Sequence, residues 1–92
     1  MESPRRIEAL YDLLDQALPE VYGYFMHRCR DRAVAEDLTS ETFLAAIDAF
    51  ERQMLDPSVP WLIGIGRHKL VDHWRRISRQ VTARRSHQRA SH

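Results

Sequence analysis

The chain has 92 residues, of which 43% are hydrophobic and 29% charged, and this size and composition suit one small globular domain with a modest core. We find no apolar run long enough to span a bilayer and no secretory leader pattern. The single cysteine, Cys29, excludes a disulfide framework and a cysteine-rich metal site. We therefore expect a reduced, cytoplasmic protein without a bound cofactor or metal.

The net charge of +1 hides a division between two parts of the chain. Residues 1–56 carry six arginines against twelve acidic residues, whereas residues 57–92 carry seven arginines and one lysine against Asp72. One explanation is that the two parts neutralise each other within one fold. The other is that they form two surfaces for two different partners, and the two explanations are compatible.

Helical periodicity begins near the N-terminus, where Ser3 and Pro4 suit a helix start. Apolar residues at helical spacing follow from Ile7 to Leu18. Pro19 is then predicted to open a second helix, which is apolar over more than half of its circumference and is therefore expected to be buried.

Asp31 is a suitable N-cap for a helix over roughly 32–52. Two apolar strips on this helix, one with Phe43 and the other with Leu38, predict a central place in a helical bundle. Between the strips lies what we call the acidic ridge: Asp37, Ser40, Glu41, Leu44, Asp48 and Glu51. A solvated surface and paired carboxylates for catalysis are two interpretations of it. We do not expect an enzyme, because no nucleophile, metal-ligand set or phosphate-binding loop accompanies the carboxylates.

The loop from Gln53 to Pro60 leads into a helix that is predicted to begin at Trp61. On a helical wheel, this helix separates an apolar stripe from a basic face. The stripe contains Ile63, Leu70, Trp74, Ile77 and Val81, and the basic face contains His68, Lys69, Asp72, Arg75, Arg76 and Arg79. Guanidinium groups suit phosphate recognition, so we favour a phosphate-binding face over a merely solvated one. Gly64 and Gly66 have no side chains, so another molecule can approach the backbone closely at the start of the helix.

Several residues of this helix have two interpretations each. Trp74 can stack on an unpaired base or belong to the core, and its place within the stripe favours the core. The core is also favoured for Trp61. Arg67 projects near the stripe, so an internal ion pair is favoured over a phosphate contact. His68 and Asp72 stand four residues apart, but a metal site there lacks a third ligand.

Apolar residues become sparse beyond Ile77, and residues 81–92 are predicted to form a flexible basic tail or a linker. No strand alternation and no internal repeat are present in the sequence. We therefore predict an all-α fold, a compact bundle of three to four helices over residues 1–80.

Two segments resemble the conserved second region of bacterial sigma factors of the extracytoplasmic-function group: AEDLTSETFLAAIDAF (35–50) and PWLIGIGRHKLVDHWRR (60–76). The preceding LYDLLDQALPEVYGYFMHRCRDRA fits the opening helices of that group, so the resemblance covers roughly residues 7–79. It implies a domain that binds the clamp of the largest RNA polymerase subunit. It also implies recognition and melting of the Pribnow-box promoter element on the non-template strand. The alternative is a sigma-like helical module that mainly binds a regulatory protein, such as an anti-sigma factor.

The resemblance also implies which residues make these contacts. Polymerase binding is implied for Asp37, Ser40 and Glu41, with Leu44 as an apolar neighbour. DNA binding is implied for the 53–60 loop, in which Met54 and Leu55 are expected to wall a pocket for an extruded base, and for the helix that follows. The helix residues expected to bind DNA are Lys69, His73, Arg75, Arg76 and, further along the basic face, Arg79. One part of the chain then faces polymerase and the other faces DNA.

Three features depart from the family pattern. Ser40 stands where the family usually has glutamine, and the 53–60 loop is short. No helix-turn-helix domain for the upstream promoter element follows in this sequence, so we expect a dissected domain or a minimal member of the family.

Overall fold

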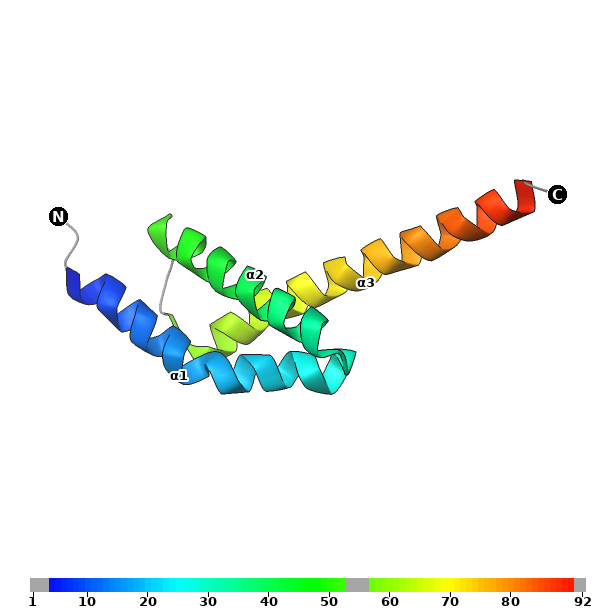
Figure 1. Cartoon of the computed structure of the whole chain (residues 1–92). Helices are drawn as coiled ribbons and strands as arrows, with labels where there is room; N and C mark the ends of the chain where they lie inside the picture. The colour runs from blue at the N-terminus through cyan, green and yellow to red at the C-terminus, as the bar shows by residue number, and fades with distance from the viewer. Residues whose placement is uncertain (1–3, 53–56, 91–92) are drawn as a thin grey trace.

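The computed structural model of the chain describes residues 4–52 and 57–90, with side chains over 7–52 and 57–84. The described residues form three helices and no strand: α1 (Pro4–Cys29), α2 (Arg32–Glu51) and α3 (Val59–Ala90). Figure 1 shows α1 and α2 as a hairpin, with α3 crossing it and then projecting beyond it. The extents along the principal axes are 63 × 26 × 17 Å, and the long one reflects this projection. The predicted all-α bundle is confirmed with three helices.

The prediction of a helix break at Pro19 is wrong, because α1 is a single helix with Pro19 inside it. A proline within a helix removes one backbone hydrogen bond and crowds the preceding turn, which bends the helix. Figure 1 shows α1 bent near its middle. Buried Leu14, Ala17 and Val21 continue the core-facing side across the proline, so packing holds both halves against the same core.

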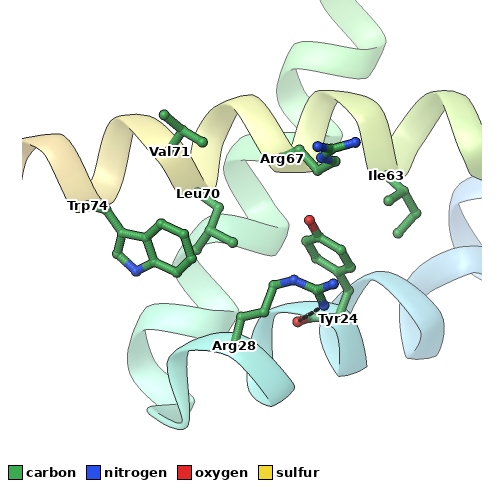
Figure 2. A pocket seen from close by; sticks show the side chains of 7 residues that line it. All are labelled: Tyr24, Arg28, Ile63, Arg67, Leu70, Val71 and Trp74. Atoms are coloured by element: carbon green, nitrogen blue, oxygen red, sulfur yellow. Dashed lines mark hydrogen bonds between the residues drawn. The ribbon is translucent and has the colours of Figure 1, made fainter.

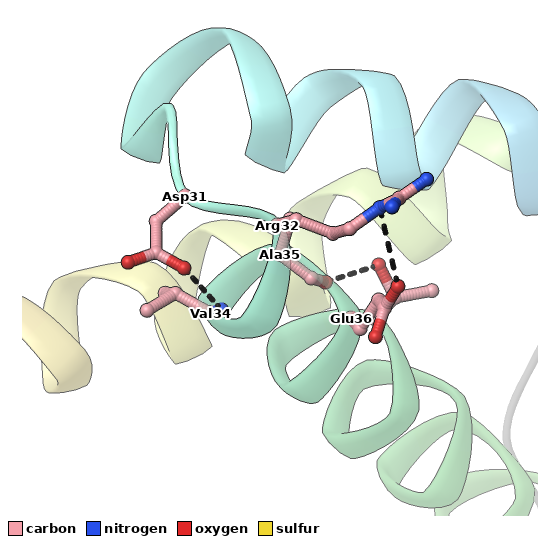
Figure 3. Close-up of polar contacts among 6 residues, drawn as sticks. Asp31, Arg32, Val34, Ala35 and Glu36 are labelled. Atoms are coloured by element: carbon pink, nitrogen blue, oxygen red, sulfur yellow. Dashed lines mark hydrogen bonds and ion pairs between the residues drawn. The ribbon is translucent and has the colours of Figure 1, made fainter.

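Only Arg30 and Asp31 connect α1 to α2. Arg30 takes the left-handed conformation (φ 55°), and its N–H donates to a carbonyl of the last turn of α1 at 2.9 Å. Asp31 caps α2 as predicted, because its carboxylate accepts a 3.1 Å hydrogen bond from the N–H of Val34 (Figure 3). An exposed ion pair between Arg32 and Glu36 (3.8 Å) follows in the same turn and contributes little to stability.

The core lies where the three helices meet. Its buried apolar residues are Leu10, Leu14, Ala17, Val21 and Phe25 of α1, Ala35, Leu38, Ala46 and Phe50 of α2, and Leu62 and Leu70 of α3. Thr39 and Thr42 of α2 are also buried, and each hydroxyl donates a 2.7 Å hydrogen bond to the carbonyl four residues earlier. Their polar groups are therefore satisfied inside the core. Helix α2 packs against both α1 and α3, as its two apolar strips predict, and α1 and α3 also pack against each other.

Helix α3 crosses the core at Gly66, where a Cβ atom would lie 3.0 Å from Cζ of Phe25 and 3.6 Å from Oγ1 of Thr42. The expectation that another molecule approaches the chain at this glycine is wrong, because Phe25 of the same fold already occupies the place. Gly64 has no such neighbour within 4 Å of its Cβ position.

Helix α3 begins at Val59, two residues earlier than predicted, and the hydroxyl of Ser58 accepts a 3.3 Å hydrogen bond from the N–H of Trp61. It then continues to Ala90, well past the point where its apolar pattern thins. No proline or glycine follows Gly66, and alanine, arginine and glutamine favour helix. The predicted tail is therefore helical as far as Ala90, and its role as a linker stays a prediction. None of the described helices combines the length and apolar character that a bilayer crossing requires.

Candidate functional site

The acidic ridge lies on the outer side of α2. Asp37 and Ser40 are exposed, and Glu41 is half-buried. Leu44, one turn further on, is 67% exposed, which is unusual for so large an apolar side chain. The structure therefore brings the four residues with a predicted polymerase contact together on one accessible side of a central helix.

The carboxylates of the ridge differ in their ion pairing. Asp48 lies 3.4 Å from Arg52 in an exposed pair, which partly neutralises the end of the ridge. Within the described part of the chain, Asp37 and Glu41 have no cationic partner within 4 Å. The two carboxylates predicted to contact polymerase are thus available to a basic partner.

The predicted DNA-binding residues of α3 differ in whether they line a groove. A groove of about 350 Å³, which we call the α2–α3 groove, is lined by Glu41, Lys69, Asp72, Arg76 and Arg79. Half-buried His73 and exposed Arg75 lie outside its lining. The groove therefore brings together Lys69, Arg76 and Arg79, whereas Arg75 is exposed outside its lining.

The α2–α3 groove also brings Glu41 of the acidic ridge next to cations of the basic face. From the sequence, these residues are expected to bind two different partners. In the fold, the two proposed surfaces adjoin at Glu41. No pattern within one helix predicts this, because it depends on how α2 and α3 are placed against each other.

A second groove, of about 460 Å³, lies between α1 and α3, and we call it the α1–α3 groove. It is lined by Tyr24, Arg28, Ile63, Arg67, Leu70, Val71 and Trp74. Figure 2 shows the ring of Tyr24 standing between the two helices, with Arg28 beside it and Trp74 at the end of the groove. The guanidinium carbon of Arg28 lies 3.7 Å from the centroid of the Tyr24 ring, and Nη1 donates a 3.3 Å hydrogen bond to the Tyr24 carbonyl.

The prediction that Trp74 belongs to the core is wrong, because Trp74 is 48% exposed. The next two residues of the predicted stripe, Ile77 and Val81, are 44% and 41% exposed, whereas Leu70 is buried. The stripe loses its cover because α3 runs past the end of the α1–α2 hairpin (Figure 1). Trp61, at the start of the same helix, packs against the core as predicted.

The internal ion pair predicted for Arg67 is also wrong, because Arg67 is exposed and has no acidic partner within the described residues. Asp72 lines the α2–α3 groove, whereas His68 lines a separate hollow with Gly64, Arg67 and Val71. The described residues hold no group of three potential metal ligands. Met54 and Leu55 lie outside the described residues, so their base pocket stays a prediction.

The half-buried thiol of Cys29 lies at the end of α1. Burial, and secondly the negative charge of Asp31, raise the pKa of this thiol. A raised pKa keeps the thiol protonated and poorly nucleophilic, so the geometry favours an inert structural cysteine.

Comparison with known proteins decides the family. The sequence model described as Sigma-70 region 2 matches residues 13–80, which include all of α2 and the basic face of α3. The chain belongs to the sigma-70 region 2 family. The family resemblance noted from the two sequence segments is therefore confirmed.

This region 2 chain is similar to several curated proteins. It is 42% identical over 71 residues to the ECF RNA polymerase sigma factor BldN of Streptomyces coelicolor, which covers 74% of the chain and 26% of BldN. It is 44% identical over 82 residues to the ECF RNA polymerase sigma factor SigC of Mycobacterium tuberculosis, and this match covers 87% of the chain and 42% of SigC. It is 28% identical over 76 residues to the ECF RNA polymerase sigma factor SigM of Bacillus subtilis, and this match covers 83% of the chain and 45% of SigM. The chain thus spans less than half the length of each of these relatives. No solved structure matches it significantly.

The part of the chain that matches region 2 holds the whole acidic ridge and all the residues that line the two grooves. The last apolar residue of the exposed stripe, Val81, and the cation Arg84 lie just beyond the match. The projecting part of α3 thus lies within the match as far as Gln80.

Proposed function

We propose that this domain is the promoter-recognition part of a sigma factor that acts in transcription initiation in the cytoplasm. In this proposal the acidic ridge binds the clamp of the largest RNA polymerase subunit. The α2–α3 groove and the helix around it bind promoter DNA, and the domain recognises and melts the Pribnow-box element on the non-template strand. Membership of the sigma-70 region 2 family supports the role in transcription initiation. The observation that carries the finer assignment is that two unpaired carboxylates of the acidic ridge, Asp37 and Glu41, lie beside or in a groove lined by three cations.

The ridge suits a protein partner better than a small ligand. Leu44 is an exposed apolar side chain, and the unpaired carboxylates of Glu41 and Asp37 precede it by about one and two turns on the same side of α2. An apolar contact with charged groups at its edge is the usual composition of a protein interface. The acidic residues favour a basic partner surface and disfavour direct contact with nucleic acid.

The groove suits a phosphate backbone. Lys69, Arg76 and Arg79 line it together, and the helix rises about 15 Å from residue 69 to residue 79. Phosphates of one strand of B-form DNA are roughly 3.4 Å apart along the axis, so this length matches about four of them. Such contacts supply affinity and position the domain, while sequence preference must come from elsewhere, such as the 53–60 loop.

Binding to a clamp fragment of RNA polymerase tests the polymerase contact. We expect the double variant Asp37→Arg/Glu41→Arg to lose clamp binding while its helicity and Tm stay close to those of the parent. Glu36→Arg is the matched control, because Glu36 is also an exposed acid of α2 but does not belong to the ridge. Normal clamp binding by the double variant would refute the assignment.

Salt dependence separates this proposal from the alternative, a module that mainly binds an anti-sigma factor. A DNA-binding domain loses affinity for single-stranded promoter DNA steeply as salt rises, because phosphate contacts release counterions. Absence of measurable DNA binding at low salt, for the domain alone and together with polymerase, supports the alternative.

A further inference from the structure

An apolar stripe on α3 extends beyond the cover that the other described helices give it. Leu70, Trp74, Ile77 and Val81 follow one another at spacings of four, three and four residues, which is the heptad pattern of helices that pack side by side. Leu70 is buried at the floor of the α1–α3 groove, and the other three are exposed in turn along α3. Scattered exposed apolar residues are ordinary, but a continuous stripe marks an interaction surface.

The residues that flank this stripe carry no negative charge. Arg67 and Ser78 flank one side at helical spacing, and His73, Gln80 and Arg84 flank the other. Arg28 adds a cation from α1 at the groove. The acid nearest in sequence, Asp72, lines the α2–α3 groove instead. The α3 flanks of the stripe and the lining of the α1–α3 groove are therefore neutral or basic.

We propose that the α1–α3 groove and the stripe that continues from it form a docking surface for an amphipathic helix of a partner protein. The partner helix presents apolar residues at heptad spacing and carries acidic residues along its edges. The surface lies on a different side of the fold from the acidic ridge. It requires neither the clamp contact nor the DNA contact proposed above.

Two other occupants fit less well. A nucleic acid strand can use the cations and can stack a base on Trp74, but aliphatic Ile77 and Val81 offer no flat surface for stacking. A second copy of the chain can match the stripe, but it brings Arg67 and Arg84 against the same arginines, and like charges oppose association. An acidic helix satisfies both the heptad spacing and the basic rim.

The length of the surface defines the probe. Residues 63 to 81 rise about 27 Å along α3, which corresponds to roughly five helical turns. A synthetic peptide of about three heptads, with leucine at the two core positions and glutamate at the flanking positions, matches this length. Its binding to the full chain is measured by fluorescence anisotropy, against a sequence-matched peptide that has lysine at the flanking positions.

We expect the glutamate peptide to bind and the lysine peptide to bind much more weakly. Trp74→Ser/Ile77→Ser is expected to weaken the affinity for the glutamate peptide tenfold or more, because two apolar side chains are no longer available for burial at the interface. Both residues are exposed, so the variant keeps its core, and circular dichroism checks its helicity. Leu18→Ser is the control, because Leu18 is 45% exposed on α1 and lies outside both grooves.

Charge reversal is the second arm of the experiment. Arg67→Glu/Arg84→Glu is expected to reverse the preference, so that the lysine peptide binds better than the glutamate peptide. Equal binding of the two peptides, or parental binding by the Trp74→Ser/Ile77→Ser variant, overturns the proposal. So does sedimentation of the free chain as a dimer that depends on Trp74 and Ile77, because the occupant is then a second copy. The proposal is also overturned if the chain binds neither peptide but binds single-stranded DNA in a way that requires Ile77 as well as Trp74. The surface is then assigned to nucleic acid.

Discussion

A Cβ atom on Gly66 would stand 3.0 Å from Cζ of Phe25, so α1 and α3 cross where only a hydrogen atom fits. Phe25 is fully buried, and its ring packs edge-on against Tyr24 with the ring centroids 5.5 Å apart and an interplanar angle of 80°. Tyr24 in turn forms a wall of the α1–α3 groove. The crossing point and the shape of this groove are therefore coupled through two aromatic rings.

The two glycines of α3 are expected to respond to alanine in opposite directions. Gly66→Ala overpacks the crossing and is expected to lower the free energy of unfolding by about 1–3 kcal/mol. Gly64→Ala is expected to raise it by roughly 0.4–1 kcal/mol, because its Cβ meets no atom within 4 Å and alanine reduces the freedom of the unfolded chain. Urea unfolding measures both. A shift of the same sign in both variants would contradict the crossing geometry.

The left-handed backbone of Arg30 predicts a stabilising substitution. Glycine adopts φ near 55° without the steric cost that a Cβ atom imposes, so Arg30→Gly is expected to raise the free energy of unfolding by up to about 1 kcal/mol. Thermal unfolding measures the change. Ala33→Gly is the control, because residue 33 is helical, and glycine there is expected to lower the Tm. If Arg30→Gly also lowers the Tm, the turn between α1 and α2 differs from the one described.

The α2–α3 groove predicts unequal roles for two adjacent arginines. Arg76→Ala is expected to weaken binding to matched and scrambled promoter strands by similar factors, and to flatten the salt slope by about 0.7 units per lost single-strand contact. Arg75→Ala is the matched comparison, because Arg75 is the neighbouring arginine but lies outside the groove. We expect it to change the slope less. A larger effect of Arg75→Ala would place the DNA path outside this groove.

Glu41 is expected to oppose DNA binding by the isolated domain, because its carboxylate lies among the cations of the α2–α3 groove. Glu41→Gln removes the negative charge with little change of shape, so DNA affinity should rise several-fold at low salt and much less at high salt. Asp37→Asn is the control, since Asp37 belongs to the ridge but not to the groove. Equal gains in both variants would indicate a general effect of net charge.

The Cys29 thiol is expected to react slowly with thiol reagents, because burial and Asp31 raise its pKa and so lower the thiolate fraction at a given pH. Asp31→Asn removes the charge but keeps a residue that caps helices well, and it should speed the reaction. The folded state holds the thiol proton more tightly than the unfolded chain does. The free energy of unfolding should therefore fall as the pH rises through the range in which the thiol ionises. Cys29→Ser is expected to remove this alkaline dependence.

Much of the local structure is determined by the sequence alone. Asp31 predicts the start of α2 because a carboxylate satisfies free N–H groups at a helix end, and the structure shows that hydrogen bond. The exposure of Asp37 and Leu44 follows from helical spacing relative to the apolar strips. The order of two short segments is enough to indicate the family, because those residues carry the pattern.

The tertiary structure decided what each face of a helix meets. Periodicity identifies Trp74, Ile77 and Val81 as one apolar side, but it cannot show that α1 and α2 end before they reach it. Pro19 predicts a break from local sterics, yet buried residues on both sides keep α1 in one piece. Glu41 and Arg76 share a groove only because α2 and α3 pack in a particular register. Local patterns follow from interactions within one helix, whereas these outcomes depend on contacts between residues far apart in the chain.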